Sequence, residues 1–503
     1  MKLQNAVRHF LFLILLNCVL FSQVSQAFQT SKIGDEKFAQ IVQKIQARLD
    51  ELHNSLGFPG ASVGFVLPDG RSGSAATGFA DLKSKTPLKT SDRLLAGSIG
   101  KTFVAVETLL LAQEGKLNLD EKIERWLGDE KWFARLPNAK DITLRMLLNH
   151  SSGIPNHVDD KNFQKTLIKN SVRADIQYKD LIAYVLDKKA LFPAGKGWSY
   201  ADTNYILIGL IIEKATGKNL YDEIEERILK PLKLTQTIPS NKISLPQTAN
   251  GYVGKSPVIE NGKFVINPQW EWAGGGFAST AEDLARWAQS LYTGGVLQKD
   301  FLDEMLKAIK TNDGSEYGLG VEIADGRFGK TYGHDSEFPG YLSDMKYFPR
   351  YKIAVAVQTN ADEMQEANRF MTTAVNDFAQ IIISELVGEK LSDVEKNRLQ
   401  KIAETWLDLI TAGKFGESRE GISAELKAKY TIENWKNVMQ NFLKKSGKFK
   451  SRKIKSVIAL DDETVTVDFE SDFGKTPPAV ETIILKLEKD GNWRVASYSI
   501  HQS

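Results

Sequence analysis

The sequence predicts an α/β (α+β) fold. A large domain of helices and antiparallel strands is followed by a small C-terminal α+β domain. Two observations support this class. Residues 35 to 56 have helical apolar spacing, and strand-like runs at residues 61 to 67 and 74 to 79 flank a Pro-Asp-Gly turn, which is typical of a hairpin. From about residue 389, two helical segments precede a run of alternating strands. With 503 residues, 42% of them hydrophobic, the chain can build a sizeable core.

The first 27 residues differ in composition from the rest. Lys2 and Arg8 precede an apolar run, Phe10 to Phe21, and Ser25-Gln26-Ala27 supplies the small residues that a signal peptidase reads. We therefore expect a signal peptide over residues 1–27 and a secreted or periplasmic protein. The alternative, an uncleaved anchor, is disfavoured because the apolar run is short for a membrane span. The remaining chain is expected to form two domains, residues 28–388 and 389–503.

Cysteine content and charge exclude several classes of function. The single cysteine, Cys18, lies in the signal segment, and Asn17 before it disfavours lipidation. The mature chain would then hold no disulfide and no cysteine-ligated metal, and no cofactor is implied. Removal of Lys2 and Arg8 leaves 63 basic residues against 63 acidic ones, from totals of 65 and 63. A net charge near zero gives no indication of a nucleic-acid partner.

Ser98 is the candidate nucleophile. It stands at a predicted strand-to-helix turn, and residues three apart share a helix face, so the Lys101 amine can reach its hydroxyl. Ser343 and Lys346 have the same spacing, but they lie in a strand-like segment where such residues point to opposite faces. The helix after Ser98, residues 103 to 114, is apolar nearly all round and should be buried.

Four further segments follow in order. A short helix from Thr143 ends in a Gly-Pro loop, whose His150 and the nearby His157 lack an acidic companion and are interpreted as structural. Tyr200 and Asp202 stand where a loop enters an apolar helix at residues 206 to 215. A three-glycine run at residues 274–276 precedes a capped helix and lacks the Gly-Lys-Ser/Thr of a phosphate loop. The Gly-His segment at residues 333–334 precedes strands 341–348 and 353–358 and a helix at about 365–386.

These segments together resemble the serine β-lactamases, most closely the class C branch with its D-alanyl-D-alanine carboxypeptidases, D-aminopeptidases and esterases. The resemblance covers about residues 35 to 388. It rests on Ser98-Ile99-Gly100-Lys101, Leu147-Leu148-Asn149-His150-Ser151-Ser152-Gly153, Tyr200-Ala201-Asp202-Thr203-Asn204-Tyr205, the Gly-Gly-Gly-Phe-Ala-Ser-Thr segment and Gly333-His334 to Gly340. It implies an antiparallel sheet flanked by helices, a helical subdomain at roughly residues 100–240, and a site between them.

The resemblance also implies roles for individual residues. Ser98 would be acylated, Lys101 would be its base partner, and Tyr200 would be the tyrosine of the second motif. His334 would face a substrate carboxylate, and the backbone N–H groups of Ser98 and Glu337 would form the oxyanion hole. The chain departs from the family pattern at two expected substrate-binding positions: Asp202 replaces the usual Asn and Ser336 replaces the usual Gly. Both departures put β-lactam turnover in doubt.

Asp202 has two interpretations. Its carboxylate could pair with the Lys101 amine, which would shift the proton acceptor for Ser98 toward the Tyr200 phenolate and favour substrates with a free amine. Alternatively, Asp202 caps a helix that starts near Asn204.

We expect a secreted serine hydrolase that forms an acyl-enzyme on a small-molecule or peptide substrate: a D-amino-acid peptide, a β-lactam or an ester. One alternative is an α/β-hydrolase-type esterase with His334 as the base of a triad. Another is a penicillin-binding-like sensor or scaffold without turnover.

The C-terminal domain is similar to small nuclear-transport-factor-like or cystatin-like domains, a resemblance that names no chemistry. Its segment from Lys444 to Lys455 is rich in Lys and Arg. We interpret it as an edge strand protected by lysines, with a contact to an anionic envelope surface as the alternative. The sequence leaves the oligomeric state open.

Overall fold

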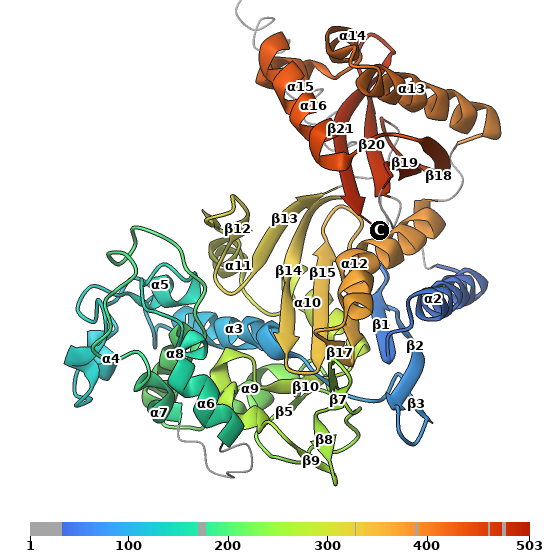
Figure 1. Ribbon diagram of the computed structural model, residues 1–503. Coiled ribbons are helices and arrows are strands. Elements are labelled where there is room, and N and C mark those ends of the chain that lie inside the picture. The colour runs from blue at the N-terminus through green and yellow to red at the C-terminus, as the bar shows by residue number, and fades with distance from the viewer. Residues whose placement is uncertain are drawn as a thin grey trace, which may run out of the picture.

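A computed structural model describes residues 33–169, 178–326, 328–387, 391–460, 463–474 and 479–502. Within these residues, a nine-stranded sheet has the order β11-β12-β13-β14-β15-β16-β1-β2-β3, and every neighbouring pair is antiparallel (Figure 1). The strands are β1 (Gly60–Val66), β2 (Ser72–Asp81), β3 (Thr86–Pro87), β11 (Ile309–Lys310), β12 (Glu316–Tyr317), β13 (Glu322–Gly326), β14 (Gly329–Phe338), β15 (Tyr341–Phe348) and β16 (Ile353–Thr359). The predicted hairpin is β1–β2.

Helices cover both faces of this sheet. Helices α2 (Asp35–Leu56) and α12 (Gln365–Val387) pack on one face, and α10 (Ala281–Tyr292) packs on the other (Figure 1). Successive side chains of β16 point to opposite faces of the sheet. Val355 belongs to the core under α2 and α12, whereas Ala354 and Ala356 belong to the core that includes α10. Gly64 on β1 allows α10 to approach, because a Cβ there would lie 2.2 Å from the Ala281 backbone.

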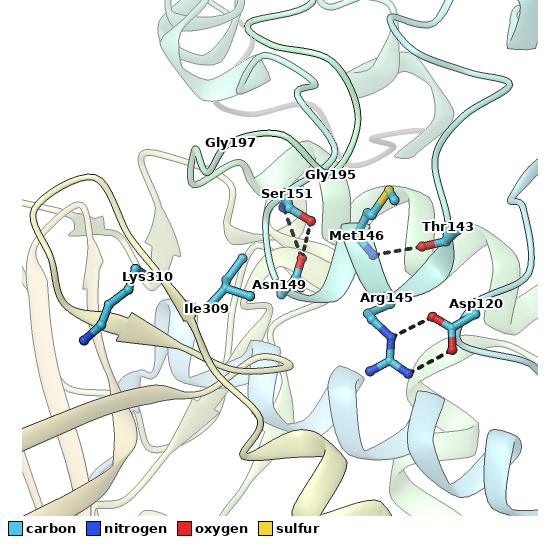
Figure 2. A pocket seen from close by; sticks show the side chains of 10 residues that line it. All are labelled: Asp120, Thr143, Arg145, Met146, Asn149, Ser151, Gly195, Gly197, Ile309 and Lys310. Carbon is cyan, nitrogen blue, oxygen red and sulfur yellow. Dashed lines mark hydrogen bonds and ion pairs between the residues drawn. The ribbon is translucent and has the colours of Figure 1, made fainter.

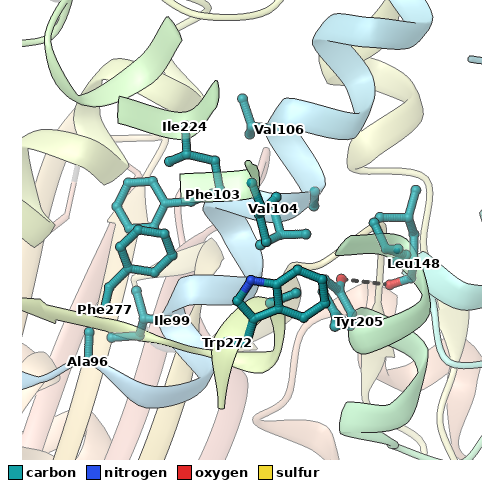
Figure 3. Packing of buried hydrophobic residues seen from close by; sticks show 14 of the residues in the cluster. Ala96, Ile99, Phe103, Val104, Val106, Leu148, Tyr205, Ile224, Trp272 and Phe277 are labelled. Atoms are coloured by element: carbon teal, nitrogen blue, oxygen red, sulfur yellow. Dashed lines mark hydrogen bonds between the residues drawn. The ribbon is translucent and has the colours of Figure 1, made fainter. Parts of the chain in front are cut away.

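A helical subdomain lies beside the sheet, between residues 100 and about 240. Its central helix, α3 (Gly100–Gln113), is buried on nearly every side, as the sequence predicts. The Phe103 ring stacks 4.5 Å from Trp287. It also lies 5.1 Å from the Phe277 ring (Figure 3). The other helices of this region are α4 (Glu124–Leu127), α5 (Leu144–Leu148), α6 (Lys161–Lys169), α7 (Tyr178–Ile182), α8 (Asp202–Thr216) and α9 (Leu220–Ile224), with a π-helical turn at Glu225–Leu229.

Short elements connect the subdomain to the sheet. A three-stranded sheet joins β4 (Leu94–Leu95), β10 (Phe277–Ser279) and β5 (Ile238–Pro239), and so anchors the chain just before Ser98. The remaining short elements are β6 (Tyr252–Val253), β7 (Ser256–Pro257), β8 (Ile259–Glu260), β9 (Lys263–Phe264), β17 (Ala361–Asp362), α11 (Lys299–Met305) and the 3-10 turns Gly97–Ile99, Phe133–Arg135, His157–Asp159, Pro268–Trp270 and Trp272–Gly274.

Glu107 is an acid buried inside α3, with 0% of its surface exposed. Its nearest cation is Arg227 at 3.4 Å, which also pairs with Glu114 and Glu223. Burial raises the pKa of Glu107 from 4.5 to about 8. Because the unfolded chain releases this proton at a lower pH than the folded protein, the group's contribution to stability is present below pH 4.5 and is lost as the pH rises through 8.

Glu107→Gln should therefore make stability less sensitive to pH. Between about pH 5 and 9 the wild type should lose about 1 to 3 kcal/mol more of its free energy of unfolding than the variant. Denaturant unfolding at several pH values measures this difference. Glu114→Gln is the control, since a hydrogen bond from Lys116 lowers the pKa of that exposed carboxyl. Parallel profiles for the wild type and Glu107→Gln would contradict the prediction.

The C-terminal part is a separate α+β unit with its own core. It contains α13 (Asp393–Thr411), α14 (Phe415–Glu420), α15 (Ala424–Lys429), α16 (Ile432–Ser446) and an antiparallel sheet of β18 (Ser451–Ala459), β19 (Thr464–Asp472), β20 (Ala479–Leu487) and β21 (Trp493–Gln502). The helices pack on one face of the sheet through a cluster centred on Trp406 and Trp435. This order of helices followed by strands confirms the predicted fold class. The exact boundary stays a prediction, because residues 388–390 lie outside the described residues.

The lysine-rich segment, Lys444 to Lys455, begins in the last turn of α16 and ends in β18, so only its second part lies on the edge of this sheet. Strand β18 is the first in the order β18-β19-β20-β21, and Lys453 and Lys455 on it are exposed. This position agrees with an edge strand protected by lysines. The unit packs on the large part through α12, where Gln380 Nε2 donates to Ser456 Oγ at 3.0 Å and Leu460 joins the core under α2 and α12.

The predicted signal peptide, residues 1–27, lies outside the described residues. Within the ranges that the structure does describe, no helix is both long and apolar enough to cross a membrane.

Candidate active site

Ser98 lies where the chain turns from β4 into α3. It is the middle residue of the 3-10 turn Gly97–Ile99, and Lys101 is the second residue of α3. The turn needs a left-handed backbone at Gly97, with φ +47°, which glycine adopts at little cost. The structure thus has the strand-to-helix turn that the sequence predicts.

The structure brings four of the predicted site residues together. Lys101 Nζ donates to Ser98 Oγ at 3.0 Å and to Asp202 Oδ1 at 2.5 Å. It also donates to the carbonyl of Gly274, at 2.5 Å. Tyr200 donates its hydroxyl hydrogen to Ser98 Oγ at 2.8 Å. The three acceptors around Nζ match the three N–H donors of a lysine ammonium, so the buried amine is fully hydrogen-bonded.

Asp202 is the first residue of α8, and it does not cap that helix. The residue at the cap position is Ala201, which has no side-chain cap bond, and the Asp202 carboxylate is turned to Lys101 instead. The interpretation of Asp202 as a cap is therefore wrong, and its pairing with Lys101 is confirmed. The Asp202 side chain keeps 19% of its surface exposed, whereas Lys101 keeps none.

Tyr200 is held as a neutral phenol. Burial and the nearby charge of Asp202 raise its pKa well above 10, and only the hydrogen bond to Ser98 acts in the opposite direction. The expectation that the Tyr200 phenolate accepts the proton of Ser98 is therefore wrong for the resting site. The physical reason is that burial disfavours the charged phenolate, and that Asp202, although it pairs with Lys101, disfavours a second negative charge beside it.

His334 lies on β14 with only 1% of its surface exposed. Its Nε2 is 2.9 Å from the Tyr317 hydroxyl and its Nδ1 is 2.6 Å from the carbonyl of Asp335. Burial and the charge of Lys101 lower its pKa to about 4, so the ring is neutral at pH 7. No described hydrogen bond joins His334 to Ser98. The predicted contact of His334 with a substrate carboxylate stays a prediction.

Ser336 and Glu337 follow His334 on β14 and lie against the nucleophile turn. A Cβ placed on Gly97 would lie 2.1 Å from Ser336 Oγ and 3.2 Å from the carbonyl oxygen of Glu337. The Ser336 side chain thus fills the space over Gly97. The oxyanion hole formed by the backbone N–H groups of Ser98 and Glu337 stays a prediction, for which this proximity is the support.

Gly97→Ala should lower kcat/KM by about 10²-fold, because a methyl group there pushes β14 away from Ser98 in a backbone conformation that disfavours alanine. Adding Ser336→Gly should recover part of the loss by reopening the space. Steady-state kinetics of both variants measure this. Gly115→Ala is the control for backbone strain alone, since Gly115 has φ +71° and a Cβ added there would have nothing within 4 Å. A double variant no better than Gly97→Ala would contradict the steric explanation.

Two residues at this site have no role in the sequence-based prediction. Glu271 is buried next to the Lys101–Asp202 pair, and burial raises its pKa to about 8. The sequence does offer one signal for Glu271: it is an acidic residue between two tryptophans, just before the glycine run. Tyr317, on the two-residue strand β12, bonds His334 and lies with its ring 6.3 Å from Tyr200. No local pattern marks Tyr317, because its contacts come from distant segments.

One group of potential metal ligands lies nearby. Ligand atoms of Glu322, His334 and Asp335 lie within 4.8 Å of one another. Both ring nitrogens of His334 are already engaged by Tyr317 and by the Asp335 backbone, and the Asp335 N–H donates to Glu322 at 3.1 Å. We therefore interpret this group as a hydrogen-bonded network rather than a metal centre.

A cavity of about 410 Å³ lies on the subdomain side, between α5, the loop at residues 195–197 and β11 (Figure 2). In it, Asn149 Oδ1 accepts from Ser151, and Arg145 pairs with Asp120. Its lining residues are Asp120, Thr143, Arg145, Met146, Asn149, Ser151, Gly195, Gly197, Ile309 and Lys310. None of the Ser98, Lys101 and Tyr200 side chains lines it, so the cavity is distinct from the contacts that these three residues make.

Comparison with known proteins assigns the class. The Beta-lactamase family model matches residues 38–380, and a second model, described as a protein of unknown function (DUF4019), matches residues 402–498. Penicillin-binding protein 4* of Bacillus subtilis is 26% identical over 308 residues, which are 58% of this chain and 65% of that protein. The chain thus spans somewhat less than two thirds of this relative.

Solved structures agree with this assignment. A D-stereospecific amidohydrolase from Streptomyces sp. has 28% identity and a TM-score of 0.57, over 66% of this chain and 98% of that one. The D-amino acid amidase from Ochrobactrum anthropi SV3 has 25% identity and a TM-score of 0.59, over 70% of this chain and 100% of that one.

The antiparallel sheet with its helical subdomain, and the hydrogen bonds of Ser98 to Lys101 and Tyr200 at the turn into α3, agree with this comparison. The chain belongs to the Beta-lactamase family, since the family model covers more than half of it. The alternative of an α/β-hydrolase is wrong, because such a fold is built on a mostly parallel sheet and the large sheet here is antiparallel.

Proposed function

We propose that this protein is a secreted hydrolase that forms an acyl-enzyme at Ser98 on small amides or esters carrying a free amine, such as D-amino-acid amides or short D-amino-acid peptides. The observation that carries the proposal is the position of Lys101 Nζ, shared between Ser98 Oγ and Asp202 Oδ1. The proposal is supported by similarity to a D-amino acid amidase and a D-stereospecific amidohydrolase.

The geometry indicates how acylation would proceed. Ser98 Oγ attacks the substrate carbonyl and passes its proton to the Lys101 amine after that amine has lost one proton. Tyr200, a neutral phenol bonded to Ser98 Oγ, is placed to donate its hydrogen to the leaving group and to take back a proton from the Lys101 ammonium, so that the proton lost by Ser98 ends on the leaving group. The leaving amine or alcohol departs, and water then hydrolyses the acyl ester by the same route in reverse. The backbone N–H groups of Ser98 and Glu337 would stabilise the oxyanion.

Asp202 gives the substrate preference. One carboxylate oxygen is bonded to Lys101, and the side chain remains partly exposed beside Ser98. A carboxylate only accepts hydrogen bonds, so it favours an ammonium and disfavours an anionic group next to the scissile bond. A free α-amine on the substrate meets this requirement, whereas the carboxylate of a penicillin does not.

Asp202→Asn should weaken the preference of the enzyme for substrates that carry a free amine. The wild type should hydrolyse D-phenylalanine amide at least about 10-fold better than N-acetyl-D-phenylalanine amide in kcat/KM, and the variant should lose most of the difference. Because the negative charge beside the Lys101 amine is removed, deprotonation becomes easier. The rising limb of the acylation rate should move to lower pH, and β-lactam acylation should improve.

Kinetics over about pH 6 to 10 with both substrates measure these effects. Asp159→Asn, which removes a nearby carboxylate that does not contact Lys101, is the matched control. An unchanged profile and unchanged substrate ratio in Asp202→Asn would contradict the proposed role. Stoichiometric labelling without multiple turnover on any amide or ester would instead support a sensor or scaffold.

A further inference from the structure

His150 follows the short helix α5 and has an unusual backbone. Its φ is +61°, a left-handed conformation that a non-glycine residue seldom adopts, and its side chain is fully buried. Such strained positions persist where surrounding contacts hold them, and they are frequent beside functional groups. The contacts that hold His150 lead directly to Tyr200.

His150 bonds the chain on both sides of Tyr200. The carbonyl of His150 accepts from the Ser199 N–H at 3.0 Å, and its ring Nδ1 accepts from the Ala201 N–H at 3.2 Å. The ring also lies 4.3 Å from the Tyr200 ring, at an interplanar angle of 35°. A single residue therefore fixes both the backbone and the ring of the tyrosine that donates to Ser98.

The hydrogen bonds also fix the form of the imidazole. Nδ1 receives a backbone N–H and faces the Asn204 amide at 3.1 Å, so it must be the unprotonated nitrogen. The proton then sits on Nε2, which has no hydrogen-bond partner among the described residues. Burial lowers the pKa of His150 well below 6.5, in agreement with a neutral ring. A proton on Nδ1 would break the bond to Ala201.

We propose that His150 is the positioning residue of Tyr200: through its carbonyl, its Nδ1 acceptor and its ring face, it holds the Tyr200 hydroxyl at hydrogen-bond distance from Ser98. The proposal rests on the proposed function, because it needs Tyr200 to act in acylation. His157, the other buried histidine of this region, bonds the Thr203 side chain instead and does not contact Tyr200 in this way.

Two conservative variants separate positioning from packing. In His150→Asn the side-chain oxygen can take the place of Nδ1, and asparagine tolerates a positive φ. In His150→Gln the oxygen reaches the place of Nε2, so Ala201 loses its acceptor. We expect His150→Asn to keep kcat within about 5-fold of the wild type and His150→Gln to lose about 10²-fold in kcat, with KM changed by less than about 3-fold. Both are measured on an aminoacyl ester, with melting temperatures for comparison.

The double variant His150→Gln/Tyr200→Phe tests the route of action. If His150 acts through Tyr200, the double variant should be no more than about 3-fold slower than Tyr200→Phe alone. The proposal would be overturned if the double variant lost the product of the two single-variant losses in kcat. Equal kcat in His150→Asn and His150→Gln would also overturn it. If His150→Gln does not fold, a loss of more than about 10-fold in kcat in a folded His150→Asn would overturn it.

The experiment distinguishes this proposal from the proposed function. Wild-type kcat in Tyr200→Phe would remove Tyr200 from acylation and overturn the positioning proposal, whereas wild-type kcat in Ser98→Ala would overturn the proposed function. A large loss in Tyr200→Phe together with multiplying losses would leave the proposed function standing and overturn only the positioning by His150. His157→Gln is the matched control: it should lower the melting temperature without the loss of about 10²-fold in kcat.

Discussion

Ser98→Ala should lower kcat by about 10⁴-fold or more on any ester or amide that the wild type hydrolyses. The alanine removes the oxygen that Lys101 Nζ and the Tyr200 hydroxyl both contact, at 3.0 and 2.8 Å. No acyl-enzyme can then form at this position. KM should change little, because the Lys101–Asp202 pair and the surrounding side chains remain.

Ser343→Ala is the matched control for this experiment. Ser343 and Lys346 repeat the Ser-x-x-Lys spacing, but both lie on β15, where Gln358 donates to Ser343 and Lys346 pairs with Asp344. The strand holds the two side chains in separate interactions, and Ser343→Ala should keep near wild-type kcat. Retention of wild-type turnover in Ser98→Ala would remove Ser98 from the mechanism.

Lys101→Ala should abolish acylation of Ser98 and lower kcat/KM by about 10³-fold, the magnitude expected when a general base is lost. The variant removes the amine beside Ser98 and leaves the Asp202 carboxylate without its partner. His334→Ala should have a smaller effect, because His334 bonds Tyr317 and the Asp335 backbone instead of Ser98. The comparison separates a lysine mechanism from a histidine triad.

Single-turnover acylation, followed by the release of a chromogenic alcohol from an ester, measures this step directly. Lys346→Ala is the control for the loss of a half-buried, ion-paired lysine, and it should acylate at nearly the wild-type rate. A Lys101→Ala enzyme that acylates normally while His334→Ala does not would reverse the assignment of the base.

Local sequence patterns predicted the long helices that cover the sheet. The helix expected at residues 35 to 56 is α2 (Asp35–Leu56), and the helix expected at about 365–386 is α12 (Gln365–Val387). Their apolar spacing is regular over several turns, and such a signal depends only on neighbouring residues. The Ser98–Lys101 contact was predictable for the same reason, since a three-residue spacing on a helix fixes it.

The contacts that the sequence did not reveal join residues that are distant in the chain. The Ser336 side chain fills the space over Gly97, and Tyr317 bonds His334, although neither pair is close in sequence. The neutral state of Tyr200 also depends on its burial and on Asp202, which no local pattern reports. His150 was expected to be structural, and the sequence could not show that its bonds surround Tyr200.

The measurement that tests the central claim most directly is peptide mapping of the covalent intermediate. The wild type is incubated with a fluorophosphonate or a slowly hydrolysed ester, digested and analysed by mass spectrometry. We predict a single adduct on the peptide containing Ser98, absent in Ser98→Ala and strongly reduced in Lys101→Ala. An adduct on Ser343 or another side chain, or rapid turnover with no adduct on Ser98, would contradict the assignment of Ser98 as the nucleophile.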